Sequence, residues 1–174
     1  MSIWWSLHLR REAASVPLAR RLLLGTMETA GVDPDVSYDL SVALSEACAN
    51  AVEHGGDQGA GEASAAYRVT AYLDGETCRI EVADSGPGFP ARRGGQCAHT
   101  AAQSAAMAAT TATAATTSTP TTAAVAAIAE GGRGLCLIEQ LADHVHFRNR
   151  PGHGAVVSFD KILKWREDAP LVAS

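Results

Sequence analysis

Residues 44–54 read Leu-Ser-Glu-Ala-Cys-Ala-Asn-Ala-Val-Glu-His and are the most informative part of the chain. Glu46 and Asn50 are four positions apart in a segment with helical periodicity, so they are expected one above the other on one helix face. An amide oxygen can ligate a hard cation such as Mg²⁺, and a neighbouring carboxylate can orient or deprotonate a hydroxyl. Each residue could also be an ordinary polar group of a helix face, and two further segments favour the functional interpretation.

Both further segments are rich in glycine, and they read Asp84-Ser85-Gly86-Pro87-Gly88 and Gly132-Arg133-Gly134-Leu135. Asp84 follows an alternating stretch at 77–83, so the sequence predicts a carboxylate at the end of a rigid strand. The second segment precedes a short predicted helix, and backbone N–H groups at a helix N-terminus attract phosphate. Asp84 could instead be only a turn former, and Arg133 could be only a solvated arginine.

The pattern of elements predicts an α/β sandwich. Residues 3–10 alternate as an edge strand would, and helix start signals occur at Ser15–Pro17 and at Asp33–Pro34. Residues 65–73 and 77–83 alternate around Asp74-Gly75, a strong two-residue hairpin signal. A short helix and a second hairpin over 144–159 follow. We expect two layers, with a mixed, mostly antiparallel sheet covered on one face by helices.

The three motifs, in this order, resemble the GHKL (Bergerat-fold) ATP-binding domain, and most of all the RsbW-like anti-sigma factor serine/threonine kinases. The resemblance covers about residues 15–160. It implies that Glu46 is the general base, that Asn50 ligates Mg²⁺ and that Asp84 accepts a hydrogen bond from the adenine amino group. The remaining positions that it assigns to nucleotide binding are Gly86, Gly88, Gly132, Arg133, Gly134 and Leu135. His54 extends the first motif, but its place near a helix end is more typical of a cap or packing residue.

Composition supports a single domain. The 174 residues suit one sizeable core, and the net charge of −5 gives no electrostatic case for nucleic acid as a partner. No apolar run approaches a membrane span, and the N-terminus lacks the features of a signal peptide. The four cysteines are scattered, which predicts free thiols in a reducing, cytoplasmic environment.

A low-complexity segment separates the two glycine motifs. Ala and Thr account for 23 of the 30 residues 100–129, with Pro120 in the middle. A segment with so few large side chains cannot build a core of its own. We therefore interpret 98–130 as a flexible insertion at the place where the resembled family keeps its ATP lid. The expected domain is residues 1–163, and 164–174 form a C-terminal tail.

The leading interpretation is therefore an ATP- and Mg²⁺-dependent regulatory kinase. By resemblance it would phosphorylate a STAS-domain anti-sigma factor antagonist on Ser or Thr and would hold a sigma factor inactive. Homodimerisation is a family expectation only, because the sequence shows no exposed apolar stripe that proves it. The alternative is an ATP-gated binding module without effective kinase activity, which the uncharged lid favours. A sensor histidine kinase is disfavoured, because too few residues precede the second helix for a dimerising hairpin.

Overall fold

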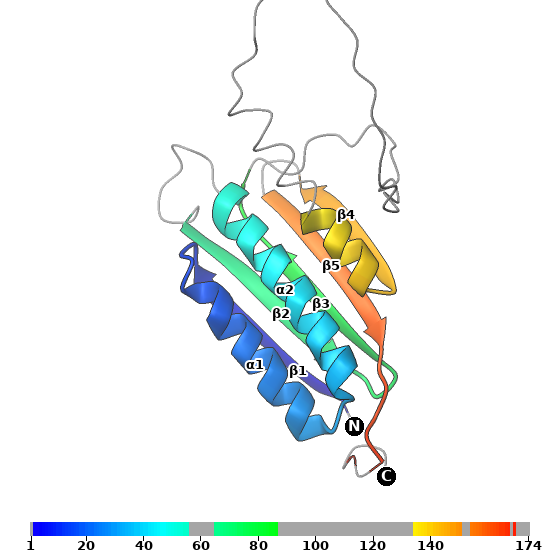
Figure 1. The fold of residues 1–174 in the computed structure, drawn as a ribbon. Coiled ribbons are helices and arrows are strands. Elements are labelled where there is room, and N and C mark those ends of the chain that lie inside the picture. Colours follow the sequence, from blue (N-terminus) through cyan, green and yellow to red (C-terminus); the bar gives the residue numbers. More distant parts are fainter. Residues whose placement is uncertain (1, 56–64, 87–133, 151–153, 168, 170–174) are drawn as a thin grey trace, which may run out of the picture.

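The computed structural model describes residues 2–55, 65–86, 134–150, 154–167 and 169 (Figure 1). Two helices and five strands have defined bounds, and residues 134–141 form a further helix. In chain order the named elements are β1 (Ile3–Arg10), α1 (Ser15–Ala30), α2 (Pro34–His54), β2 (Ala66–Leu73), β3 (Thr77–Ala83), β4 (His144–Arg150) and β5 (Gly154–Ile162). The expected lid at 98–130 lies outside the described residues.

The five strands form one open sheet in the order β1-β2-β3-β5-β4. All four pairings are antiparallel and their registers run without interruption, so the described sheet is wholly antiparallel and not mixed as expected. The strand expected over 3–10 is confirmed and lies at one edge of the sheet. The other edge is β4. The last strand, β5, lies inside the sheet and pairs with both β3 and β4.

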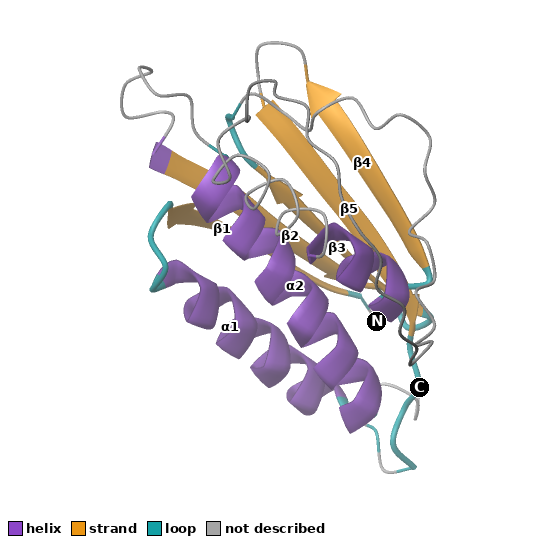
Figure 2. Cartoon of the chain, turned by 45° about the horizontal axis from the view of Figure 1, so that its top comes forward, coloured by secondary structure: helices purple, strands orange, loops and turns teal. Residues whose placement is uncertain are grey.

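The helices cover one face of the sheet, as the two views of Figure 1 and Figure 2 show. Burial along β2 and β3 alternates, so every second side chain of these strands points into the layer beneath the helices. The buried face of α2 closes this core, which confirms the expected two-layer α/β sandwich. The largest fully buried side chains are Phe159, Leu23, Met27, Leu40, Leu44, Leu73, Ile80 and Ile138.

Local chemistry at the start of α2 agrees with the predicted start signal, whereas α1 begins after Ala14 without a side-chain cap. Asp33 caps α2, and its side chain accepts from the backbone N–H of Asp35 at 2.9 Å, while Pro34 occupies the first turn. α1 ends at Gly31, which has φ +85° and therefore a left-handed conformation suited to glycine. Gly31 and Asp33 together fix where α2 begins, and this start determines which residues lie at the C-terminal end of α2.

The connection between β2 and β3 has three residues, 74–76, whereas a two-residue hairpin loop was expected. Gly75 has φ +95°, and the Asp74 carboxylate accepts from the backbone N–H of Glu76 at 3.1 Å and of Thr77 at 2.8 Å. These bonds hold the pKa of Asp74 below its usual value. Because Asp74 satisfies both N–H groups, the longer loop stays ordered.

The start of the predicted C-terminal tail is docked on the turn between α1 and α2. Asp33 N–H donates to the carbonyl of Lys164 at 2.8 Å, and Arg166 N–H donates to the carbonyl of Gly31 at 2.9 Å. Trp165 Nε1 donates to the carbonyl of Gly75 at 3.0 Å. Within the described part of the chain, no helix is long and apolar enough to cross a membrane.

Candidate functional site

The polar edge of α2 carries Glu46 and Asn50, one turn apart. Both side chains are half-buried, whereas Leu44, Ala47 and Ala51 point into the core. Helical periodicity therefore separates a core stripe from a polar stripe on the same helix, as the sequence predicted. The polar stripe lies between the core and solvent, which is where a ligand can reach it.

Gly134 lies against these two side chains. A Cβ built on Gly134 would be 2.9 Å from Glu46 Oε2, 3.6 Å from Asn50 Nδ2 and 3.7 Å from Asn50 Oδ1. The first residue of the helix over 134–141 thus meets the middle of α2, although about 85 positions separate them in sequence. Any larger residue at 134 would press on the Glu46 carboxylate, so the absence of a side chain keeps this space open.

Asn50 carries an unusual group for a folded interior. Its Nδ2 is buried and has no hydrogen-bond partner within the described residues. An unpaired buried amide is costly, because desolvation is not repaid by a hydrogen bond. Such an amide fits a ligand-binding residue whose partner arrives with the ligand, and the oxygen of the same group is a suitable Mg²⁺ ligand. The described residues contain no group of three or more His, Cys, Asp and Glu side chains placed to hold a metal.

Asp84 follows β3, and its carboxylate is held in a fixed orientation. Asp84 Oδ1 accepts from Gly86 N–H at 2.9 Å and from Ala155 N–H at 3.0 Å, while Asp84 N–H donates to the carbonyl of Ala155 at 2.9 Å. Oδ2 has no hydrogen bond to the described residues. Asp84 is therefore a turn former through one oxygen, and the other oxygen remains an oriented acceptor.

Three glycines make the close packing around Asp84 possible. A Cβ on Gly55 would be 2.8 Å from Asp84 Cβ, and one on Gly86 would be 2.6 Å from the carbonyl oxygen of His54. Gly154 has φ +95°, and a Cβ there would overlap the backbone carbonyl of Asp84. These contacts bring the end of α2, the turn after β3 and the start of β5 together.

Several expected site residues cannot be assigned a place. Gly88, Gly132 and Arg133 lie outside the described residues, so their expected roles stay predictions. Leu135 is half-buried in the first turn of the helix that starts at 134. His54 is exposed in the last turn of α2, with Nε2 3.7 Å from Glu53 Oε2.

Sequence analysis missed one residue that positions the site. Arg11 Nε donates to the carbonyl of Ala51 at 3.2 Å, and its Nη2 donates to the carbonyl of Val52 at 3.0 Å. A cation at the C-terminal end of a helix satisfies carbonyls that lack helical partners and interacts favourably with the helix dipole. Arg11 thus fixes the turn of α2 that follows Asn50, but its position 40 residues earlier gave no local signal.

The cysteines divide into two kinds. Cys48 and Cys78 are buried free thiols, and burial raises the pKa of each to about 12. Cys48 therefore fills core space beside the site, as expected. Cys136 is disulfide-bonded, so the prediction of a free thiol is wrong for this residue.

Comparison with known proteins identifies a family and a similar fold. A family model described as the histidine kinase-like ATPase domain matches residues 9–161. Among solved structures, the chain resembles the RsbU and RsbW domains of a Mycobacterium tuberculosis protein, with a TM-score of 0.59 and 18% sequence identity. That match covers 94% of this chain but 33% of the other, so this chain spans about a third of its length. At such identity the likeness shows the fold alone. No curated protein matches significantly.

Proposed function

The chain belongs to the family of histidine kinase-like ATPase domains, and we propose that it is a regulatory protein-serine/threonine kinase. In this proposal it phosphorylates a STAS-domain anti-sigma factor antagonist and sequesters a sigma factor in the cytoplasm. The proposed catalytic unit is a single ATP-binding domain over residues 1–163, with 98–130 as its lid. The RsbW-like fold supports this choice within the family.

The observation that carries the proposal is the meeting of Glu46, Asn50 and Gly134. A carboxylate and an unpaired buried amide face a glycine at the start of a helix, within 3.7 Å of where its Cβ would be. A carboxylate, an amide oxygen and a helix N-terminus are what a magnesium-bound phosphate needs around it. The Nδ2 of Asn50 has no hydrogen-bond partner among the described residues, which leaves it available to a ligand.

We assign each residue one task. Bound Mg²⁺ and ATP supply charge neutralisation and the phosphoryl group. Asn50 would hold the metal through its amide oxygen, and Glu46 would accept the proton of the attacking serine or threonine hydroxyl. Asp84 would accept the adenine amino hydrogen through Oδ2, the oxygen that its own turn does not use.

The glycine segments complete the proposed nucleotide site. Gly86 and Gly88 would let the backbone pass close to the base, and Gly132, Gly134 and Leu135 would present backbone N–H groups to phosphate. Arg133 is the proposed cation of this turn.

A second candidate is an ATP-gated binding module that transfers no phosphate. The neutral Ala/Thr composition of 100–129 favours it, because such a segment offers no charged group to phosphates. Both candidates require the same nucleotide site, so only phosphate transfer separates them.

The deciding experiment compares Glu46→Gln with Glu53→Gln. Both change a carboxylate of α2 to an amide, but Glu53 is exposed beside His54 and lies outside the proposed site. Each variant would be incubated with cell lysate, with and without Mg-ATP, and the recovered partners mapped for phosphosites by mass spectrometry. Loss of general-base catalysis predicts that Glu46→Gln lowers phosphate transfer about 10²- to 10⁴-fold.

Three outcomes are informative. Transfer to a STAS-domain protein that is lost in Glu46→Gln and kept in Glu53→Gln would support the kinase. Partners recovered in an ATP-dependent way but never phosphorylated would favour the binding module. Equal transfer by both variants would remove Glu46 from the proposed mechanism.

A further inference from the structure

The face of the sheet that lies opposite the helices carries an excess of arginine. Figure 1 and Figure 2 show the helices together on the other face, so in the described part of the chain no helix covers this one, which we call the outer face. Side chains point to it from alternate residues of all five strands, and register pairs these residues with one another. Its exposed arginines are Arg10, Arg68, Arg79, Arg148 and Arg150.

This outer face is basic although the chain as a whole is acidic. Glu81 and Asp160 are the only acidic residues among the described strand residues that point to it. With five arginines against two carboxylates, the outer face has a formal charge of +3, whereas the whole chain has −5. The remaining residues are therefore strongly acidic, and the net charge of the chain hides a local positive surface. Such a surface attracts a negatively charged partner.

Both carboxylates are already occupied within the outer face. Asp160 Oδ1 lies 2.8 Å from His144 Nδ1, and its Oδ2 lies 4.0 Å from Arg79 Nη2. Glu81 Oε1 lies 3.7 Å from Arg150 Nη2. The acidic residues thus offset the charge of two of the five arginines and leave the other three uncompensated.

Three arginines of the outer face have no partner of their own. Arg10, Arg68 and Arg148 make no side-chain hydrogen bond or ion pair with the described residues. Arg68 and Arg148 stand in the same row across the sheet. The two strands between them place Ala83 and Val156 in this row. Because the row contains no carboxylate among its described residues, its arginines lack a stabilising cross-strand ion pair and can accept an anion from outside.

The spacing of these two arginines matches an extended peptide. Neighbouring strands are about 4.8 Å apart, so three spacings put the backbones of Arg68 and Arg148 about 14 Å from each other. In an extended peptide, side chains four positions apart point to the same side and are also separated by about 14 Å. A segment that runs across the strands could therefore place one carboxylate over each arginine. Arginine binds a carboxylate through two parallel N–H bonds, which lysine cannot reproduce.

From these features we propose that the outer face binds an acidic segment of a partner protein, with Arg68 and Arg148 as the two anchors. Carboxylates of that segment would pair with the two guanidinium groups, and Arg10 would add a third positive charge from the edge strand. The proposal does not depend on the proposed kinase function, because Glu46 and Asn50 lie on α2, on the opposite side of the sheet.

The composition and size of the outer face suit a protein partner. Trp4 and Tyr72 are register partners there and are 67% and 44% exposed. Tryptophan, tyrosine and arginine are the residue types most enriched at energetically important positions of protein interfaces. Five strands about 4.8 Å apart and about seven residues long give a face of roughly 600 Å², at the lower end of specific interfaces and typical of a transient complex.

Two other polyanions fit the outer face less well. Each basic residue beside an anionic membrane raises the affinity only about fivefold, so a formal charge of +3 would give weak attachment. A nucleic acid presents a long row of phosphates, which the acidic remainder of the chain would repel. A short acidic segment avoids both difficulties, because it needs only the unpaired arginines and accepts hydrogen bonds from their paired N–H groups.

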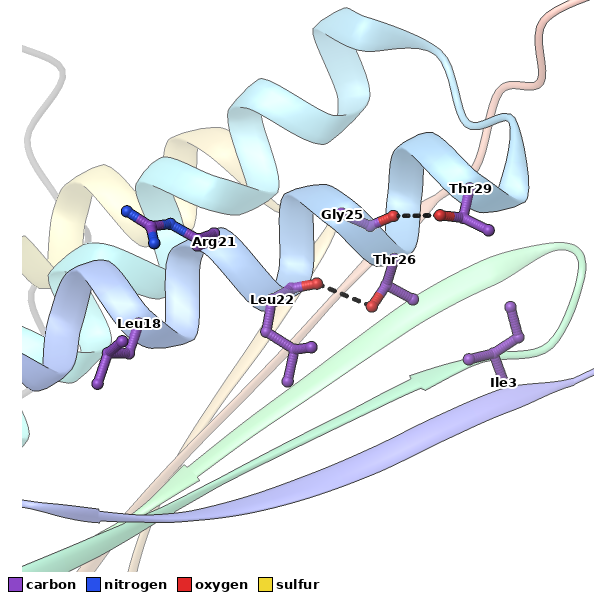
Figure 3. Close-up of a pocket in the computed structure, with 7 residues that line it drawn as sticks. All are labelled: Ile3, Leu18, Arg21, Leu22, Gly25, Thr26 and Thr29. Carbon is purple, nitrogen blue, oxygen red and sulfur yellow. Dashed lines mark hydrogen bonds between the residues drawn. The ribbon is translucent and has the colours of Figure 1, made fainter.

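The test is fluorescence anisotropy of a labelled glutamate peptide of about ten residues, long enough at ~3.4 Å per residue to cross the sheet. The peptide is titrated with the full chain, without nucleotide, at low salt and at about 0.15 M salt. Arg68→Glu/Arg148→Glu is compared with Arg20→Glu/Arg21→Glu, which changes the net charge equally but on α1. Figure 3 shows Arg21 on that helix, at a groove between α1 and Ile3 of β1.

We expect salt-sensitive binding of the peptide that Arg68→Glu/Arg148→Glu weakens at least about tenfold, since two attractive pairs become repulsive. The milder Arg68→Gln/Arg148→Gln should give a smaller loss, and the α1 variant should bind like the unmodified chain. Circular dichroism should be unchanged in all three variants. A photoreactive form of the peptide, mapped by mass spectrometry, should label the strands and not α1.

Four results would overturn the proposal. They are the absence of saturable peptide binding, an equal loss in the α1 variant, labelling of α1 in place of the strands, and tighter binding of phosphatidylserine vesicles or of a single-stranded oligonucleotide than of the peptide. The first would leave the outer face without an acidic protein ligand, and the second would reduce the effect to net charge. The last would assign the same arginines to a membrane or to a nucleic acid.

Discussion

Replacing Asp84 by asparagine separates the structural task of this residue from its proposed task in base recognition. In the folded chain, Oδ1 accepts from Gly86 N–H at 2.9 Å and from Ala155 N–H at 3.0 Å. The carbonyl of an asparagine can keep both bonds. Its NH₂ group then replaces Oδ2, so the proposed acceptor for the adenine amino group becomes a donor.

The expected cost differs between folding and binding. Folding loses only the charge assistance of two backbone bonds, roughly 1–2 kcal/mol. Binding loses a hydrogen bond to a charged acceptor, about 1.5–3 kcal/mol, and two donors then face each other. We therefore expect Asp84→Asn to raise the Kd for ATP by about 10- to 150-fold. A nucleotide whose base carries a carbonyl at the same position, ITP, should be affected less or bound better.

Isothermal titration with ATP and ITP, in the presence of Mg²⁺, measures both effects, and urea unfolding reports the stability. Asp74→Asn is the matched control, because its carboxylate also accepts two backbone N–H bonds but lies in the β2–β3 loop. It should lose stability without losing ATP affinity. An Asp84→Asn protein that is folded and binds ATP as tightly as the unmodified chain would refute the proposed adenine contact.

Three further predictions concern stability. Gly75 and Gly154 both have φ +95°, but only a Cβ on Gly154 would overlap the backbone of another residue, Asp84. Gly75→Ala should therefore lower the free energy of unfolding, measured with urea, by about 1–2 kcal/mol, and Gly154→Ala should lower it clearly more. The lowered pKa of Asp74 stabilises the fold above the unfolded pKa, and this part should vanish as pH falls below about 4 and be absent in Asp74→Asn. The thiols of Cys48 and Cys78, with pKa raised to about 12, should destabilise the fold as pH rises above about 9, where only the unfolded chain ionises. Because both thiols are buried, mass spectrometry should find them unalkylated in the native chain at about pH 8.

Much of the fold followed from local patterns. The stripe of α2 separated Leu44 and Ala47 from Glu46 and Asn50, and the structure keeps this division. The strands and the cap at Asp33 were predictable because period-two alternation and side-chain capping act over a few residues. Residues 134–141 are helical, as the apolar spacing after the second glycine motif indicated.

Other features depend on contacts that local patterns do not encode. Arg11 reaches the carbonyls of Ala51 and Val52 across 40 residues, and an arginine at the end of a strand gives no sign of this. The sequence also holds no sign that Asp84 Oδ1 accepts from two backbone N–H groups, because the second of these, that of Ala155, is 71 positions away.

The geometry of the site has a consequence for how its parts can move. Asp84 is tied to β5 through Ala155, and the end of α2 is tied to the turn after β1 through Arg11, so the side of the site that carries Asp84 is anchored at two points. Gly134 faces Glu46 and Asn50 across the space that its missing side chain leaves. The later part of the same helix is held on the core, because Ile138 is fully buried and the carbonyl of Leu141 accepts from Lys161 Nζ at 2.7 Å. In the proposed site, an effect of nucleotide on this helix would therefore act at its first turn, beside Glu46 and Asn50, and not on its later residues. Under the proposed function, we expect ATP to act on partner binding through position 134 and the first turn of its helix, and not through the sheet.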